Sequence, residues 1–435
     1  MKPICLHPEN KKYFLFRGEP TVLVTSASHY GAIINRKYDY VKELDELARH
    51  GLNLVRLFGG HYHEIPGDFG IVKNILAPLP EYYIAPFQKT TQGKYNLDLP
   101  NPEYYDRLVD YVQKCYDCGI VVEMTIFCPF YHDRLWDVCP MNGKNNVNGV
   151  GNTDKLSFHR LTDAATVQAQ EAYVAQYLNT LNKFDNIYYE IINEPWANKV
   201  PLEFELHFAD FIKAYEKNLP LQHMVARNPA NGWERVDEHE SIDLINFHYA
   251  SPPYAVEANK HLPCAVGLNE TGFAGSDPAT YRKQAWDFMM SGGALFNNLD
   301  YSFAEGYEDG TWYDPKDPGA GSTELRSQLG TLKKFLMSAD LIHLQPDMKP
   351  IKRCHAFHAQ GYCLKGKDEY LFYFRSNNEL FVLLDLPEGD YEFKWIKVLS
   401  GEEKLELIRI EGIYEFRYDK FSDIEELALH VRKKH

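Results

Sequence analysis

The chain has 435 residues, of which 45% are hydrophobic, 25% are charged and 14% are aromatic, and its formal net charge is −15. This composition is typical of a globular protein, and the apolar runs are all shorter than a membrane-spanning helix. The negative charge excludes nucleic acid and anionic membranes as expected partners, because both would repel the chain.

The N-terminus and the cysteines bear on location and bound groups. The first residues, MKPICLHPENKKYFLF, contain no apolar stretch of signal-peptide length. We therefore expect a cytoplasmic protein, or a secreted or periplasmic one whose leader has been removed. The eight cysteines form no disulfide framework, and the CxxC pair in KCYDCG has no second ligand pair at zinc-site spacing. We expect no metal and no cofactor.

Eight apolar runs predict strands, at 21–26, 53–58, 120–127, 187–192, 223–228, 244–249, 264–269 and 294–300. Amphipathic segments between most of them predict helices, several of which end at a glycine. Eight strand-helix units within the first 340 or so residues predict an α/β fold, a (β/α)₈ barrel. A doubly wound sheet is the competing layout, but no Gly-rich phosphate loop follows the first strand.

The pattern changes after residue 344. Short alternating strands follow, divided by turn sequences such as PEGD and SGEE. The sequence therefore predicts two domains. Residues 1–344 form a catalytic barrel with a short N-terminal β segment, and residues 345–435 form a small, sandwich-like antiparallel β domain.

The segments that follow the second and third predicted strands are too long for simple turns. The first of them is rich in tyrosine and phenylalanine, which disfavours disorder. We expect ordered walls that close one end of the barrel mouth. The high aromatic content fits either core packing or a cleft in which aromatic faces stack on sugar rings.

Polar residues stand at the carboxyl ends of the predicted strands, where a barrel of this type carries its active site. Glu194 follows the fourth strand and Glu270 ends the seventh. We predict these two glutamates as catalytic residues. The predicted substrate-binding residues are His29, Arg56, Asn193, Trp196, His248, Tyr249, Asn298 and Tyr301.

Two carboxylates at one barrel mouth suit the hydrolysis of a glycosidic bond. One is protonated and assists the leaving oxygen, while the other is ionised and attacks or activates water. Asn193 can hydrogen-bond a sugar hydroxyl, and Pro195 ends the strand by removing a donor. Arg56 and the pair His248 and Tyr249 would keep the second carboxylate ionised.

These residues carry a family resemblance. The sequence YYEIINEP, the Glu in VGLNETGF and the Arg in LNLVRLFG resemble the clan A glycoside hydrolases, especially cellulase-like enzymes of family 5, over roughly residues 20 to 340. The resemblance implies that Glu194 is the acid/base, that Glu270 is the nucleophile, and that a β-linked carbohydrate is cleaved with retention of configuration.

The chain departs from that family in two places. His248 and Tyr249 are adjacent, whereas the family pattern separates them by one residue, so we expect only one to face the pocket. Many relatives place a Trp at the end of strand eight as a sugar platform, but this chain has FNNLDYSF there. Polar contacts from Asn298 and Tyr301, or a Tyr301 platform, would replace it.

Other residues have structural interpretations. Glu190 is interpreted as a structural acid paired with Arg56 or another interior donor, because a buried carboxylate needs partners. His132, Asp133 and Trp136 either line the pocket or anchor a loop. The HYHE sequence at 61–64 is interpreted as a surface loop and not as a metal site.

The sequence thus predicts a retaining β-glycosidase with exo action on oligosaccharides. A transglycosidase would share every residue named. A carbohydrate-binding barrel without turnover is the alternative from another class, and the presence of both carboxylates with their supporting Arg and Asn disfavours it.

Overall fold

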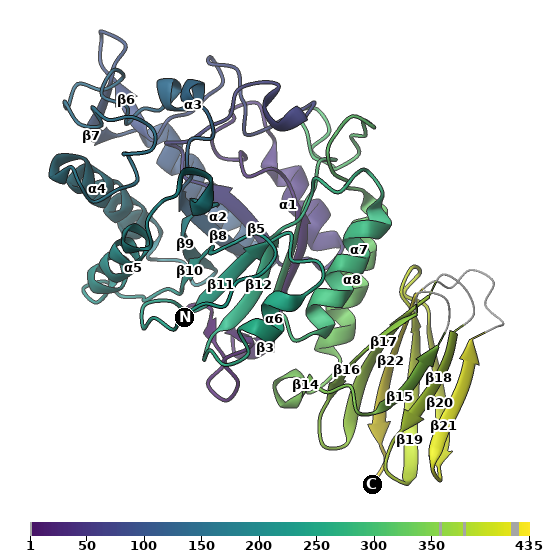
Figure 1. Ribbon diagram of the computed structural model, residues 1–435. Helices are drawn as coiled ribbons and strands as arrows, with labels where there is room; N and C mark the ends of the chain where they lie inside the picture. The colour runs from purple at the N-terminus through teal and green to yellow at the C-terminus, as the bar shows by residue number, and fades with distance from the viewer. Residues whose placement is uncertain (1, 356–358, 377–379, 419–425) are drawn as a thin grey trace.

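The computed structural model describes residues 2–355, 359–376, 380–418 and 426–435. Figure 1 shows a barrel wrapped by helices, with a separate β domain beside it that contains the C-terminus. Within the described residues, no helix combines the length and the apolarity that a membrane span needs.

Eight parallel strands form the barrel sheet, in the order β4-β13-β12-β11-β10-β9-β8-β5. In chain order they are β4 (Leu23–Ala27), β5 (Leu54–Phe58), β8 (Val121–Phe127), β9 (Ile187–Ile192), β10 (Val225–Arg227), β11 (Leu244–His248), β12 (Ala265–Glu270) and β13 (Leu295–Leu299). The Phe58 N–H bonds the Tyr30 carbonyl at 3.2 Å and brings the two ends of the sheet together. The predicted barrel and its eight strands are confirmed.

The helices of the barrel domain cover the outside of this sheet, except α3, which lies in the long loop after β8 (Figure 1). They are α1 (Tyr40–Arg49), α2 (Pro102–Cys118), α3 (Asp133–Val138), α4 (Ala164–Leu181), α5 (Leu202–Glu216), α6 (Tyr254–Ala258), α7 (Pro278–Met290) and α8 (Thr323–Met337). Local sequence sets their ends: Asn101 caps α2, Pro102 occupies its first position, and Gly119 ends it with φ +70°. Because helices cover the outer face and side chains fill the inner one, strands such as β5 and β9 are buried at every residue.

Two short sheets and three 3₁₀ helices complete the barrel domain. The N-terminal sheet contains β1 (Cys5–Leu6), β2 (Phe14–Phe16) and β3 (Glu19–Thr21), and a hairpin contains β6 (Phe87–Lys89) and β7 (Tyr95–Pro100). The 3₁₀ helices are η1 (Asp68–Gly70), η2 (Pro195–Asn198) and η3 (Leu341–His343).

The two long loops at the barrel mouth bind each other. The Tyr95 N–H in β7 bonds the Asn145 carbonyl at 2.8 Å, and the Leu97 N–H bonds the Asn148 side chain at 2.8 Å. The loops after β5 and β8 therefore form one connected wall above the strands (Figure 1).

The C-terminal domain consists of two antiparallel sheets. One has the order β14-β16-β17-β22-β19-β20 and the other β15-β18-β21. Their bounds are β14 (Gln345–Pro346), β15 (Ile351–His355), β16 (Gln360–Lys365), β17 (Glu369–Arg375), β18 (Leu380–Asp385), β19 (Gly389–Lys397), β20 (Glu403–Ile410), β21 (Ile413–Tyr418) and β22 (Glu426–Lys433). The predicted all-β fold of this region is confirmed, and its first strand, β14, begins at Gln345.

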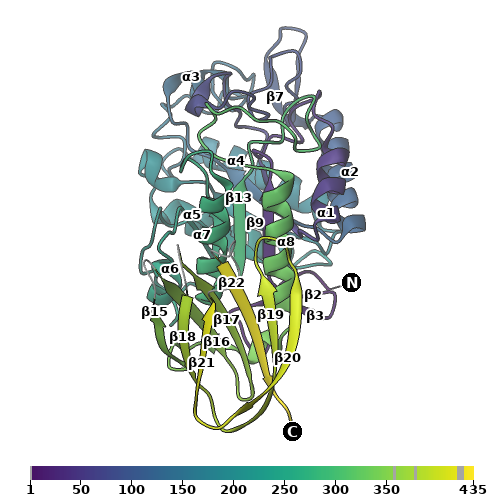
Figure 2. The ribbon, with the colours of Figure 1, turned by 90° about the vertical axis from the view of Figure 1, so that its right-hand side faces the viewer.

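This domain packs on α7 and α8, as Figure 2 shows. The Trp286 ring of α7 stacks on Tyr373 of β17 at 4.8 Å between centroids. Beside it, buried Arg282 pairs with Glu426 of β22 at 2.7 Å. The contact lies on the side of the barrel, away from the strand ends that carry the pocket.

Candidate active site

A buried arginine lies under the barrel mouth and contacts three carboxylates. Arg56, near the end of β5, is 2% exposed. Its guanidinium lies 2.9 Å from Glu123 and 3.1 Å from Glu270, and it also pairs with Glu190. The interpretation of Glu190 as a structural acid paired with Arg56 is confirmed. Because one cation serves three acids, the cluster has more acidic groups than positive charge.

One of these carboxyls, Glu123, is the member best placed to hold a proton. Burial and the neighbouring Glu190 raise the pKa of Glu123 to about 8, although Arg56 opposes the shift. The pKa of Glu190 shifts in the opposite direction. Burial raises it, but Arg56 and a hydrogen bond from Asn246 lower it by more than burial raises it, so the net shift is downward.

Glu270 ends β12 and accepts hydrogen bonds on both carboxylate oxygens. The Tyr30 hydroxyl donates to Oε2 at 2.8 Å, where Arg56 also donates, and the Tyr249 hydroxyl donates to Oε1 at 2.5 Å. Burial raises the pKa of Glu270, but His248, Arg56 and the two tyrosines outweigh it and lower the pKa overall. Glu270 is therefore held as a carboxylate.

Glu194 follows β9 on the opposite wall, and its backbone has φ +37°. The Tyr131 hydroxyl donates to Oε2 at 2.7 Å, and His248 Nδ1 lies 3.0 Å from Oε1. The Glu194 side chain is 14% exposed, against 7% for Glu270. Glu194 thus faces the cavity with fewer partners than Glu270 has.

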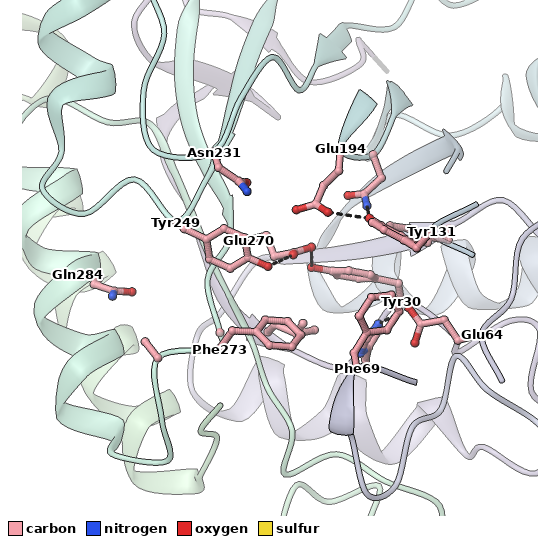
Figure 3. A pocket seen from close by; sticks show the side chains of 16 residues that line it. Tyr30, Glu64, Phe69, Tyr131, Glu194, Asn231, Tyr249, Glu270, Phe273 and Gln284 are labelled. Atoms are coloured by element: carbon pink, nitrogen blue, oxygen red, sulfur yellow. Dashed lines mark hydrogen bonds and ion pairs between the residues drawn. The ribbon is translucent and has the colours of Figure 1, made fainter. Parts of the chain in front are cut away.

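The two glutamates face one cavity of about 460 Å³ at the carboxyl ends of the strands. One carboxylate oxygen of Glu194, one of Glu270 and a ring nitrogen of His248 all lie within 4.8 Å of one another. Figure 3 shows Glu194 and Glu270 pointing toward each other across the pocket. Residues from the loops, the strand ends and α7 line it: His29, Tyr30, Phe58, Glu64, Phe69, Tyr131, Asn193, Asn231, Tyr249, Gly272, Phe273, Ala274, Gln284 and Leu299.

The same trio of side chains has metal-ligating types, but its hydrogen bonds suit a carboxylate pair better. Both oxygens of Glu270 already accept hydrogen bonds, and Arg56 puts a positive charge 3.1 Å from one of them.

Several solved glycoside hydrolase structures have a similar fold. One glycoside hydrolase aligns with a TM-score of 0.67 and 14% identity over 100% of this chain and 97% of its own. A glycoside hydrolase family 5 protein from Bacteroides vulgatus aligns with a TM-score of 0.66 and 14% identity over 99% of this chain and 93% of its own. The endo-1,4-beta-mannanase from Rhizomucor miehei aligns with a TM-score of 0.52 and 14% identity over 78% of this chain and 99% of its own. No family model matches the sequence, and no curated protein is significantly similar to it.

The protein has the fold of the clan A glycoside hydrolases. At 14% identity this similarity establishes the fold, and the first two alignments include the C-terminal β domain. Within this glycoside hydrolase fold, the roles of individual residues rest on the geometry of the site.

Only one residue of the adjacent pair after Phe247 lines the cavity, as expected: Tyr249 does so and His248 does not, although both side chains contact a catalytic carboxylate. His248 lies 3.0 Å from Glu194, and Tyr249 donates to Glu270. The register of β11 shifts between Phe247 and His248, and Tyr249 has φ +51°. This irregularity breaks the strand alternation that would otherwise send adjacent side chains to opposite faces.

The other predicted substrate-binding residues differ in position. His29 and Asn193 line the pocket, whereas Arg56 supports Glu270 from behind. The Trp196 ring packs edge-on against His248 at 5.7 Å and is not among the residues that line the cavity. Asn298 is buried and does not line the cavity, and its amide donates to Ser26 and to the Ala320 carbonyl.

Tyr301 is also outside the cavity wall, so it forms no exposed platform. Tyr301 is only 5% exposed. Gly272 and Gly319 lie against its ring, and a Cβ on Gly319 would come within 2.4 Å of it. Phe273 packs edge-on at 6.1 Å. Because Gly272 and Gly319 have no side chains, their backbone covers the Tyr301 ring, which was expected to serve as a sugar platform.

Two loop interpretations are settled by contacts. His132 pairs with Asp68 at 3.1 Å, and the Trp136 indole donates to the Thr153 carbonyl at 3.0 Å, so both anchor loops. The interpretation of HYHE as a surface loop is wrong: His61 is fully buried, and Glu64 is 4% exposed. Aromatic rings from β8, from α4 and from the loop after β8 pack around His61.

Several pocket residues were not predicted as site residues. Tyr30 follows His29 directly at the end of β4, so its position in the sequence could have identified it. Tyr131, Glu64, Phe69 and Phe273 belong to loops, and only the tertiary structure brings them to the cavity. Glu64 lies 3.3 Å from His29 and adds a third carboxylate to the pocket.

Proposed function

We propose that the protein is a retaining glycoside hydrolase that cleaves β-linked glycosides, with Glu270 as nucleophile and Glu194 as acid/base. One observation carries the proposal: two carboxylates face each other within one cavity, and their surroundings are unlike. The approach of 4.8 Å or less between their oxygens supports retention, since retaining enzymes hold the carboxyl groups about 5 to 5.5 Å apart.

The surroundings of the two glutamates support the proposed roles. Glu270 is kept ionised by Arg56 and two tyrosine hydroxyls, as a nucleophile must be. Glu194 faces the cavity with greater exposure and protonates the leaving oxygen in the first step. In the second step it removes a proton from water, which then attacks the glycosyl-enzyme and frees Glu270.

The charge of the pocket indicates a neutral sugar. Glu64, Glu194 and Glu270 line the cavity, and no lysine or arginine of the described part of the chain does so. A uronic acid would place a further negative charge among three carboxyl groups, and like charges at this range repel. We expect neutral glycosides to be cleaved and the matching glucuronides to be left intact.

The connected wall of the loops after β5 and β8 supports exo action on oligosaccharides. It borders the cavity through Glu64, Phe69 and Tyr131, and it would block a glycan chain from running through the cleft in that direction. Release of monosaccharide alone from oligosaccharides of increasing length is the expected result. Early fragments from the middle of the chain would show an open cleft.

A transglycosidase shares the first chemical step and differs in whether water or a sugar accepts the glycosyl group. A binding protein without turnover would need no ionised nucleophile. A panel of α- and β-linked nitrophenyl glycosides separates these possibilities, because the enzyme is expected to release nitrophenol from a β-glycoside only. Turnover that depends on an added acceptor sugar would indicate transfer, and binding without release in the whole panel would indicate a lectin-like barrel.

A further inference from the structure

Two phenylalanines at the cavity combine an exposed ring with an unfavourable backbone. Phe69 is 38% exposed with φ +57°, and Phe273 is 44% exposed with φ +53°. A positive φ strains a bulky residue, and a phenyl ring in water is unfavourable as well. Neither feature stabilises the folded chain, and such strain concentrates at functional sites. Both residues line the cavity.

Phe69 is coupled by contacts to Glu194. Its ring packs edge-on against Tyr131 at 5.1 Å, and the Tyr131 hydroxyl donates to Glu194 at 2.7 Å. The turn that carries Phe69 is held by Asp68, whose carboxylate accepts the Ile65 N–H at 3.0 Å. The ring therefore has a fixed position relative to the acid.

Phe273 is coupled in the same way to Glu270. Its ring packs edge-on against Tyr249 at 6.3 Å, and Tyr249 donates to Glu270 at 2.5 Å. Its loop is held by Tyr281, whose hydroxyl accepts the Ala274 N–H at 3.0 Å. Each carboxylate thus has one tyrosine beside it and one exposed phenylalanine beyond the tyrosine.

In the view of Figure 3, both rings lie on the side of the pocket opposite Glu194, with Glu270 between. The leaving oxygen must lie beside Glu194, since that residue protonates it. The sugar that is transferred to Glu270 therefore extends from the scissile bond toward the two phenylalanines. Polar groups lie on this side as well, because Glu64 is there in Figure 3 and His29 lies 3.3 Å from it.

We propose that Phe69 and Phe273 form an aromatic clamp that holds the transferred pyranose ring by its C–H faces, while His29 and Glu64 bind its hydroxyls. The clamp rests on the proposed function, and its ligand class is a neutral pyranose. The geometry also explains why the covered Tyr301 is not needed as a platform, because Phe273 lies over it at the cavity surface. A pyranose matches a wall of this kind, since it is apolar on its faces and polar around its rim.

Kinetics of single variants test the clamp on the nitrophenyl glycoside that the wild type cleaves fastest. Phe69→Ala and Phe273→Ala should each lower kcat/KM on the order of 10- to 100-fold, mainly through a higher KM, because burial of one ring is lost. Phe→Tyr at each position should keep most of the activity. Leu407→Ala is the matched control, since Leu407 is also exposed but lies in the C-terminal domain, and it should change nothing.

A purely structural role would give a different pattern. If the rings only support Tyr131 and Tyr249, the alanine variants should lower kcat and shift the pH profile while KM stays constant, and that result would overturn the clamp. Phe69→Gly and Phe273→Gly add a stability measurement, because glycine removes the strain of a positive φ. The clamp predicts weaker substrate binding with an unchanged or higher Tm, whereas a marked fall in Tm would show that the rings hold the fold.

Direct binding separates the clamp from the proposed function. Glucose, mannose, galactose and xylose are titrated by calorimetry into Glu270→Gln and into the same protein with both phenylalanines replaced by alanine. If the wild type hydrolyses no glycoside but a monosaccharide binds only when the rings are present, the clamp holds and the hydrolase proposal fails. Equal affinity with and without the rings contradicts the clamp, whatever the hydrolysis assay shows.

Discussion

Two buried arginines show how differently the barrel mouth and the domain interface use charge. At the interface, Arg282 binds one carboxylate in a two-pronged contact, with Glu426 oxygens 2.7 and 3.1 Å away. At the mouth, Arg56 is shared among three carboxylates. A matched buried pair fixes two surfaces against each other, whereas a shared cation leaves acidic groups whose protonation can change. The ion pair at the interface therefore holds the two domains together, whereas the carboxyl groups at the barrel mouth can gain and lose protons.

The largest loss of activity is expected when Glu270 is replaced. Glu270→Gln keeps the shape but removes the nucleophile, so kcat on the best nitrophenyl glycoside should fall on the order of 10⁴- to 10⁶-fold. Glu123→Gln is the control from the same cluster. Because burial and Glu190 raise the pKa of Glu123 to about 8, it is mostly protonated at pH 7 and an amide resembles it. We expect activity within about tenfold of wild type, given that the Arg56 contact weakens. Similar losses in both variants would contradict the division of roles.

Removal of the acid should have the next largest effect. Glu194→Ala should lower kcat/KM by about 10² to 10⁴-fold on a substrate with a poor leaving group, and less on one with a good leaving group. Azide should restore turnover on the good leaving group and yield a β-glycosyl azide, because the small anion enters the space of the lost carboxylate. An absence of glycosyl azide, or formation of the α anomer, would show that Glu194 is not the acid/base.

At the interface, the same kind of change should affect stability and leave chemistry intact. Glu426→Gln leaves buried Arg282 without its carboxylate and should cost about 3 to 5 kcal/mol of stability, seen as a lower Tm. The exposed pair of Lys334 and Glu403 crosses the same interface at 2.8 Å, and Lys334→Ala should cost less than about 1 kcal/mol. The kcat of folded Glu426→Gln should equal that of the wild type; a large loss would mean that the interface acts on the site.

The smallest effect concerns the acid limb of the pH profile. Burial raises the pKa of Glu270, but His248, Arg56 and the tyrosines lower it overall, so kcat/KM should persist below the usual glutamate range and fall only when Glu270 is protonated. Tyr249→Phe removes a donor to the charged form, which raises the Glu270 pKa and moves the acid limb upward on the order of one pH unit. A Tyr249→Phe profile that superimposes on the wild type would contradict this coupling.

The sequence predicts the strands better than the pocket, for physical reasons. Runs such as IYYEII are buried on both faces, so their composition alone predicts a strand, and the position of Glu194 follows from the strand end. The expectation that only one of His248 and Tyr249 lines the pocket is correct, but strand alternation does not anticipate the register shift that lets both side chains reach a carboxylate. Phe69, Glu64 and Phe273 could not be placed, since loop contacts between distant segments decide which of their side chains reach the cavity.

The central claim is that Glu270 attacks the sugar and forms a covalent intermediate. A 2-deoxy-2-fluoro glycoside with a good leaving group, chosen to match the sugar that is cleaved, slows the breakdown of this intermediate enough for mass spectrometry of the digested protein. The account predicts one added glycosyl group on the peptide that contains Glu270, and none in Glu270→Gln. An adduct on Glu194, or turnover that yields the inverted sugar with no adduct at all, would contradict it.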